Sequence, residues 1–233
     1  ETGNVRRRDD AELTAALAPL TEAYGGVRAY FRGTRDPSVC WSMTAGGIEI
    51  GLSDYLADAP DAVILEFVAA AMRKRDRPPT PLYTEWMACE GFTVGKQDLF
   101  LARSRNLAGT PVGTHHDLRD AVRRLIDADL IGADDVGDAR FTWTRRPNRQ
   151  RIGYCAVSMR VIAVSCLLDD PDVPEHVLDY VVFHEILHLI RGPHPFRRPH
   201  DRGFNAMEAA FPRKEEAERF LRHFTQVPIR NQL

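Results

Sequence analysis

Two histidines and a glutamate near residue 185 are spaced so that they can hold a metal ion and use it. They lie in the stretch His184-Glu-Ile-Leu-His188, which has the form H-E-x-x-H. Helix residues four apart lie one turn apart on the same face, so both imidazoles can reach one ion. Glu185 projects from an adjacent edge, from which it can reach a water molecule beside that ion. The pattern predicts a metal site with His184 and His188 as ligands and Glu185 as the catalytic acid and base.

The residues around this motif predict that it lies on a buried helix. Apolar side chains occupy most positions between Pro174 and Gly192 and lie almost all round the expected helix. The proline suits the start of a helix, and Gly192 followed by proline suits its end. Imidazoles and a carboxyl group are costly to bury there unless they are paired or bind a metal. We therefore favour a metal site over a chance match to the motif.

A catalytic zinc ion needs a third protein ligand and one position left for water. His194, His200 and Glu208 follow the helix and could supply that ligand. We favour His200, because Phe204 and the apolar residues after it predict a short helix that would hold the ring beside the site. For His194 the preferred interpretation is an exposed loop residue. For Glu208 it is a solvated carboxylate or one that supports a ligand from behind.

These motifs resemble those of the SprT-like zinc metallopeptidases (the Wss/SprT and YgjP-related group), which are zincins. The resemblance rests on H-E-x-x-H, on His200-x-x-x-Phe204 and on the strand-like segments around Gly153 and Ile162, and it covers about residues 141–212. It implies an α+β, zincin-like fold with a small sheet and an active-site helix, a Zn²⁺ cofactor, and a protein or peptide substrate.

The same resemblance implies a role for each residue of the motif. It makes zinc ligands of His184, His188 and His200, and it makes Glu185 the catalytic acid and base. No cysteine follows Cys166, so no C-terminal zinc ribbon is expected. The attachment to DNA that is known for some members is therefore not carried over to this chain.

The ligand set predicts the chemistry. Three neutral imidazoles leave most of the ion's charge uncompensated, which lowers the pKa of a bound water from about 15.7 toward 7. Glu185 would take the proton as the water attacks a carbonyl and then pass it to the leaving amine. By analogy with zincins, an extended peptide would lie along a strand edge, for which Arg160–Leu167 is the candidate. Hydrolysis of peptide bonds is the predicted reaction.

Hydrophobic periodicity predicts an alternation of helices and short strands on both sides of a loop. Residues Arg75–His116, rich in proline and glycine, are expected to form a loop or linker with at most one helical turn. The predicted helices are Asp10–Tyr24, Pro60–Lys74, Asp117–Asp129 and the one starting at Pro174. The predicted strands are Val27–Phe31, Val39–Met43, Ile48–Leu52, Ala139–Thr144, Arg151–Val157 and Arg160–Leu167.

The two halves follow one order of elements and share a short stretch of sequence. Shifted by 114 residues, Ile48–Lys74 lies over Ile162–His188 without a gap and with five identities. We interpret residues 1–110 as an N-terminal α/β unit, either a degenerate repeat or an unrelated extension, and residues 111–233 as the metallopeptidase domain. Ala70, Ala71 and Lys74 overlie the three motif residues, so the first copy could not bind a metal.

Composition argues against a nucleic-acid-binding, a membrane-spanning or a secreted protein. The 233 residues carry 31 Lys+Arg against 33 Asp+Glu, so the whole chain is not expected to attract nucleic acid or an anionic membrane. The longest apolar stretches are too short to span a bilayer. The four cysteines form no C-x-x-C pair, and no apolar leader segment is present. These features predict a cytoplasmic protein with reduced thiols.

Two other functions compete with a general peptidase. One is a non-catalytic module in which zinc is structural and the chain binds a partner. The other is a DNA-associated protease acting on nucleoprotein, for which Arg191, Arg197, Arg198 and Arg202 would contact phosphates. Because no aromatic residues interleave with these arginines, a solvated surface is the preferred interpretation.

Overall fold

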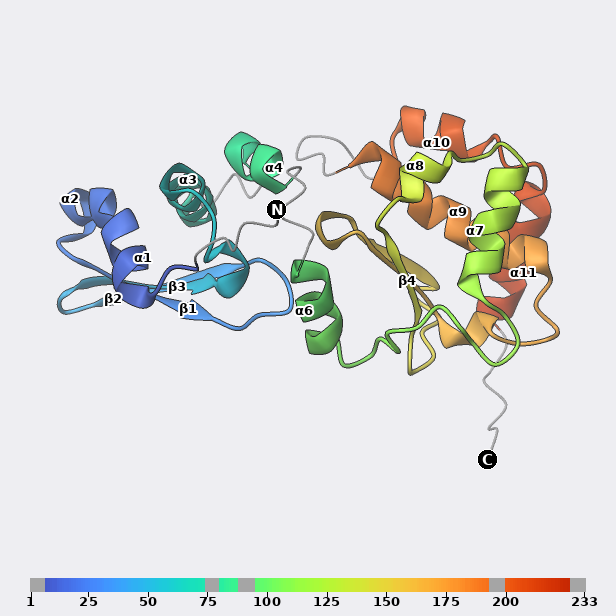
Figure 1. Cartoon of the computed structure of the whole chain (residues 1–233), viewed down its shortest axis with the longest axis horizontal. Helices are drawn as coiled ribbons and strands as arrows, with labels where there is room; N and C mark the ends of the chain where they lie inside the picture. Colours follow the sequence, from blue (N-terminus) through green and yellow to red (C-terminus); the bar gives the residue numbers. More distant parts are fainter. Residues whose placement is uncertain (1–6, 74–79, 88–94, 193–199, 227–233) are drawn as a thin grey trace, which may run out of the picture. The chain divides into compact units, whose positions relative to one another are not determined.

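The computed structural model describes residues 7–73, 80–87, 95–192 and 200–226. The chain divides into two compact units, Glu1–Arg103 (unit 1) and Ser104–Leu233 (unit 2), which are coloured from blue to green and from green to red in Figure 1. Each unit combines helices with a three-stranded mixed sheet, so the predicted α+β class is confirmed. Within the described residues, no helix has both the length and the apolar character needed to cross a bilayer.

The described part of unit 1 has three strands and several helices. Its strands are β1 (Val27–Arg32), β2 (Val39–Thr44) and β3 (Gly47–Ser53). Its helices are α1 (Asp10–Ala16), α2 (Thr21–Tyr24), α3 (Asp61–Met72), α4 (Pro81–Met87) and α6 (Lys96–Arg103), with 3₁₀ turns at Ala18–Leu20 and Asp54–Leu56. The predicted helix Asp10–Tyr24 is wrong in one respect, because it breaks around Pro19 into α1, a 3₁₀ turn and α2.

Unit 2 carries the H-E-x-x-H motif. Its strands are β4 (Arg140–Trp143), β5 (Gly153–Ala156) and β6 (Val161–Val164). Its helices are α7 (Leu118–Asp127), α8 (Ala133–Val136), α9 (Glu175–Arg191), α10 (Arg202–Glu208) and α11 (Lys214–Gln226), with 3₁₀ turns at Val157–Met159 and Cys166–Leu168. The predicted strand Arg160–Leu167 is too long, because Cys166–Leu168 forms a 3₁₀ turn.

Where the structure describes it, the segment predicted as a loop between residues 75 and 116 contains two helices. They are α4 and α6, each preceded by part of the proline- and glycine-rich sequence. The prolines and glycines that predicted an irregular segment lie mainly outside these two helices, so the composition of the whole segment concealed them.

The sheets of the two units share the same strand order. In unit 1 the central strand β3 pairs parallel with β1 and antiparallel with β2, and in unit 2 the central strand β6 pairs parallel with β4 and antiparallel with β5. The pair Val27–Ile48 of unit 1 corresponds to Phe141–Ile162 of unit 2, a shift of 114 residues. The same shift relates the first residues of α3 and α9. The similarity found in the sequence therefore extends to the order, direction and register of β1 and β3.

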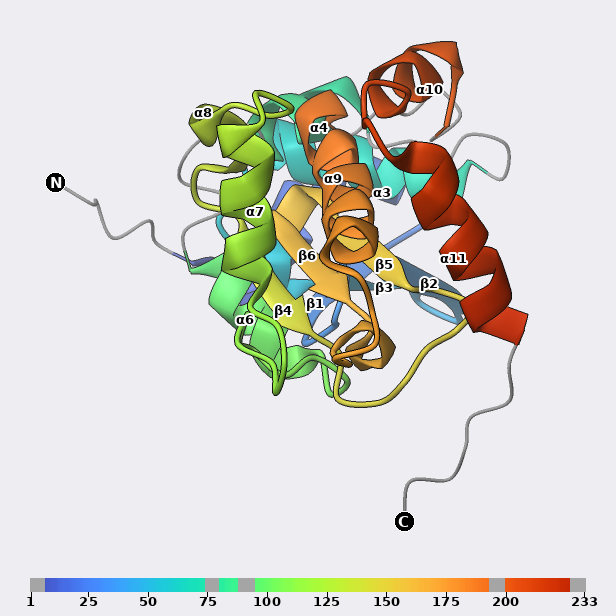
Figure 2. The same cartoon turned by 90° about the vertical axis from the view of Figure 1, so that its right-hand side faces the viewer.

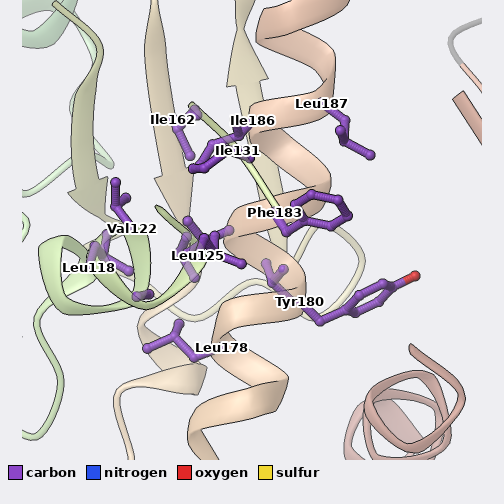
Figure 3. Packing of buried hydrophobic residues seen from close by; sticks show 14 of the residues in the cluster. Leu118, Val122, Leu125, Ile131, Ile162, Leu178, Tyr180, Phe183, Ile186 and Leu187 are labelled. Carbon is purple, nitrogen blue, oxygen red and sulfur yellow. The ribbon is translucent and has the colours of Figure 1, made fainter. Parts of the chain in front are cut away.

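Helix α9 forms the centre of the core of unit 2. It packs against α7, α10 and α11 and against β5 and β6 (Figure 2). In Figure 3, Ile162 of β6 lies close to Ile186 of α9, while Tyr180 and Phe183 leave α9 on the side away from α7. The helix is apolar on nearly all sides and ends at Gly192, whose φ of 65° lies in the left-handed region that glycine adopts readily.

Candidate metal centre

The middle of α9 presents His184, Glu185 and His188 as the sequence predicts. His184 and His188 are half-buried and share one face of the helix, with ring centroids 5.0 Å apart. Glu185 is almost fully buried, at 6% exposure. The charged and polar groups of the motif therefore lie inside the apolar surroundings of α9, where each needs a partner.

His200 lies directly before α10 and is held by its neighbours. Asp201 caps α10 by accepting a hydrogen bond from the backbone N–H of Phe204 at 3.0 Å. Arg191, the last residue of α9, forms two 2.8 Å contacts with the carboxylate of Asp201. A planar guanidinium that contacts both carboxylate oxygens restricts their mutual orientation. The end of α9 is thus linked to the residue next to His200.

The ring of Phe204 fixes the other side of the cluster. Phe204 is fully buried, and its centroid lies 5.0, 4.6 and 4.7 Å from those of His184, His188 and His200. The aromatic residue of the His-x-x-x-Phe pattern therefore packs against all three imidazoles. It removes water from one side of the cluster and restricts the rotamers of the rings.

The three imidazoles converge through their Nε2 atoms. The Nε2 atom of His200 lies 3.2 Å from that of His184 and 3.1 Å from that of His188. A tetrahedral ion with metal–nitrogen bonds of about 2.0–2.1 Å would separate its nitrogen ligands by about 3.3 Å. All three ligand atoms lie within 4.8 Å of one another, so His184, His188 and His200 form a candidate metal site.

The protonation of the rings suits a cation. Burial, together with the nearby His184 and His200, lowers the pKa of His188 to about 4. Burial also lowers the pKa of His184, although Glu208 opposes that shift. At neutral pH both rings are therefore uncharged, and each has one nitrogen with a free lone pair. Converging lone pairs repel one another unless a cation lies between them.

Glu208 supports His184 from behind and is not one of the three converging ligands. The Nδ1–H group of His184 donates to Oε1 of Glu208 at 2.6 Å, which leaves the lone pair on Nε2. Burial alone would raise the pKa of Glu208, but hydrogen bonds from Lys214, His184 and Tyr180 lower it below its usual value. Glu208 is only 7% exposed, so the solvated alternative is wrong and the supporting role fits.

Two partners of Glu208 were not anticipated from the sequence. Tyr180 donates its hydroxyl hydrogen to Oε1 of Glu208 at 3.0 Å, and Lys214 at the start of α11 contacts Oε2. Tyr180 precedes His184 by four residues, a spacing that places both on one helix face and could have indicated the contact. No local pattern identifies Lys214, because its position depends on how α11 packs against α9.

Glu208→Gln tests the supporting role. The amide keeps the shape of the side chain but removes the charge that Lys214 and the Nδ1–H of His184 bind, so zinc affinity should fall by about 10- to 100-fold. Competition against a chromogenic chelator measures this. The matched control is Glu216→Gln on α11. It removes an exposed carboxylate that is paired with Arg213, and it should leave the zinc affinity unchanged. Equal affinities for the two variants would contradict the role of Glu208.

Glu185 faces β5 and depends on the absence of a side chain there. A Cβ atom on Gly153 would lie 2.4 Å from Oε1 of Glu185 and 2.9 Å from its Cγ. Burial raises the pKa of Glu185 to about 8, and the positive charge of Arg151 opposes this shift. A nearby cation would lower that pKa and favour the carboxylate. The carboxyl group is therefore held between α9 and β5, next in sequence to His184, and its protonation would depend on whether a cation is bound nearby.

Of the four arginines considered as possible phosphate contacts, one is bound to a carboxylate of its own unit. Arg191 is bound to Asp201, so it holds the loop before α10 in place. Arg202 is exposed at the start of α10. Arg197, Arg198 and the alternative ligand His194 lie outside the described residues.

Comparison with known proteins adds no relative from which a function could be transferred. No family model, no curated protein and no solved structure matches the chain.

Proposed function

We propose that this chain is a zinc-dependent metallopeptidase of the SprT-like, zincin type. The observation that carries the proposal is the convergence of three Nε2 atoms beside a buried glutamate. Three protein ligands with one position open to solvent and substrate are typical of catalytic zinc sites. His200 is exposed, which is consistent with access to the site from solvent.

The residues divide the chemistry between them. When bound, zinc would supply an activated water molecule and polarise the carbonyl of the scissile bond. Glu185 accepts a proton from the water as its oxygen bonds to the carbonyl carbon. It then returns the proton to the amide nitrogen as the carbon–nitrogen bond breaks, giving a carboxylic acid and an amine. Glu208 holds His184 in the tautomer that presents Nε2 to the ion.

The strand edge nearest the motif is β5, which corrects the expectation for Arg160–Leu167. That segment contains β6, the central strand, and both of its edges are already paired. The carbonyl of Ile152 accepts from the N–H of Ser165 at 2.7 Å, so by alternation the backbone groups of Gly153 and Cys155 point away from β6. A peptide paired with this edge would pass beside Glu185.

Gly153→Ala tests whether the close approach of β5 positions the catalytic carboxyl. The added methyl group overlaps Glu185, which is too buried to move freely, so peptide hydrolysis should fall by up to about 100-fold with zinc content unchanged. The matched control is Gly46→Ala in unit 1, where a Cβ atom would meet no other atom within 4 Å. Both variants should have their zinc content, melting temperature and kcat/KM measured. Full activity of Gly153→Ala would show that Glu185 is not constrained in this way.

Removal of the metal tests the proposed function itself. We expect the chain, stripped with a chelator and reloaded with one equivalent of Zn²⁺, to cleave an unfolded, alkylated protein and release new amino termini. The stripped chain should be inactive, because its remaining groups polarise neither the water nor the carbonyl. Zinc binding without any cleavage would favour the non-catalytic module, and cleavage by the stripped chain would exclude a metal-dependent mechanism.

A further inference from the structure

A cavity of about 440 Å³ adjoins the candidate metal centre. His184 and Glu185 of α9 line one side, and the segment leading into β5, with Ile152 and Gly153, lines another. The third side belongs to α11 and includes Leu221. A substrate whose scissile carbonyl lies at the imidazole cluster would therefore place a neighbouring side chain in this space.

The apolar part of the cavity wall comes from three aliphatic residues, while most of the other lining residues are polar or charged. Ile152 and Leu221 pack against the core of unit 2 but are only half-buried, and Val181 of α9 completes the apolar surface. The hydroxyl of Tyr180, another lining residue, lies within hydrogen-bond distance of Glu208 at 3.0 Å and of Glu218 at 3.1 Å. Contact between these aliphatic residues and an apolar ligand removes apolar surface from water, which favours binding.

Two arginines, Arg151 and Arg222, line the cavity together with Glu185 and Glu218. A guanidinium nitrogen of Arg222 lies 3.6 Å from a carboxylate oxygen of Glu218, which is one turn earlier on α11. The guanidinium of Arg151 lies 5.0 Å from the ring centre of Tyr154, and its charge acts on Glu185. Each of these two arginines thus lies near a carboxyl group, and the aliphatic residues of the wall supply the contacts that can discriminate between substrate side chains.

The cavity depends on α11, which lies outside the two sequence motifs that form the candidate metal site. The H-E-x-x-H and His-x-x-x-Phe elements end before residue 212, whereas α11 begins at Lys214. Lys214 and Glu218 connect α11 to Glu208 and Tyr180, so the helix that closes the cavity is also bonded to the support of His184.

We propose that the cavity between β5, α9 and α11 binds a large apolar side chain of the substrate, such as Leu, Met or Phe, next to the scissile bond. Leu221 is then a specificity-determining residue. The inference rests on the proposed peptidase function, because it takes the three-histidine cluster as the place of the scissile carbonyl. Sites of this kind discriminate between side chains by roughly 10- to 200-fold through apolar contact alone.

A binding experiment tests the proposal without relying on turnover. The probes are peptide hydroxamates, whose hydroxamate anchors at the zinc ion and whose first side chain is Gly, Ala, Asp, Leu or Phe. We expect the zinc-loaded full chain to bind the Leu and Phe probes at least tenfold more tightly than the Ala and Asp probes. Methyl resonances of Leu221 and Val181 should shift most on titration. Leu221→Trp, which fills the cavity, should reduce the preference for Leu and Phe to less than threefold.

The control is His223→Trp, which adds the same side chain at an exposed position of α11 outside the cavity and should keep the preference. Equal binding of all probes to the unmodified chain, or an unchanged preference in Leu221→Trp, would overturn the inference. Selective binding combined with a failure to cleave unfolded protein would support the apolar cavity and remove the proposed peptidase function, so the two failures are distinguishable.

Discussion

Glu185→Gln is expected to keep zinc at about one ion per chain and to lower peptide hydrolysis by about 10²- to 10⁴-fold. The amide has the shape of the carboxylate but cannot accept the proton of the attacking water. The three converging nitrogen atoms are untouched by the change, so metal binding should persist. The neutral side chain should also be tolerated at this buried position, where burial disfavours a charge.

The measurement compares zinc content and kcat/KM on matched samples of Glu185→Gln and the unmodified chain. Glu66→Gln on α3 is the control, since it makes the same chemical change in unit 1 and should affect neither quantity. Turnover that survives the substitution at Glu185 would mean that another group accepts the proton, and the mechanism proposed for this site would have to be replaced.

His200→Ala is expected to remove most zinc binding. The loss of affinity should exceed the 10- to 100-fold expected for Glu208→Gln, because His200 contributes a ligand atom itself. Since His200 is exposed, the metal-free variant should unfold at the same temperature as the metal-free unmodified chain. Zinc should then raise the melting temperature of the unmodified chain only, because stabilisation follows binding to the native state.

His223→Ala is the matched control, because it removes an exposed histidine of α11 that lies outside the cluster. It should bind zinc as the unmodified chain does. If His200→Ala keeps its zinc, another residue supplies the third ligand, and His194→Ala in the same background would identify the remaining candidate from the sequence.

The sequence was most informative where function depends on local spacing. His184 and His188 lie on one helix face because four residues make about one turn, and Phe204 follows His200 at the spacing that brings its ring against the imidazoles. The starts of α3 and α9 were also predictable, because a proline precedes each of them.

What the sequence did not predict depends on contacts between distant segments. Lys214 reaches Glu208 only because α11 packs against α9, and the amphipathic pattern of α11 does not indicate what it covers. The choice of edge strand failed for a related reason. Arg160–Leu167 is apolar enough to predict a strand. Its central position in the sheet follows from pairing with both β4 and β5, and the residues of the strand itself do not indicate those partners.

The repeated strand order also bears on how the chain acquires its structure. Among the described residues, each sheet is built only from strands of its own unit. In each sheet the central strand comes last in the sequence, within a few tens of residues of the two outer strands with which it pairs. Such short separations cost little loop-closure entropy and favour rapid formation of each sheet. The first sheet can therefore assemble while the second half is still being synthesised, before the metal ligands have left the ribosome.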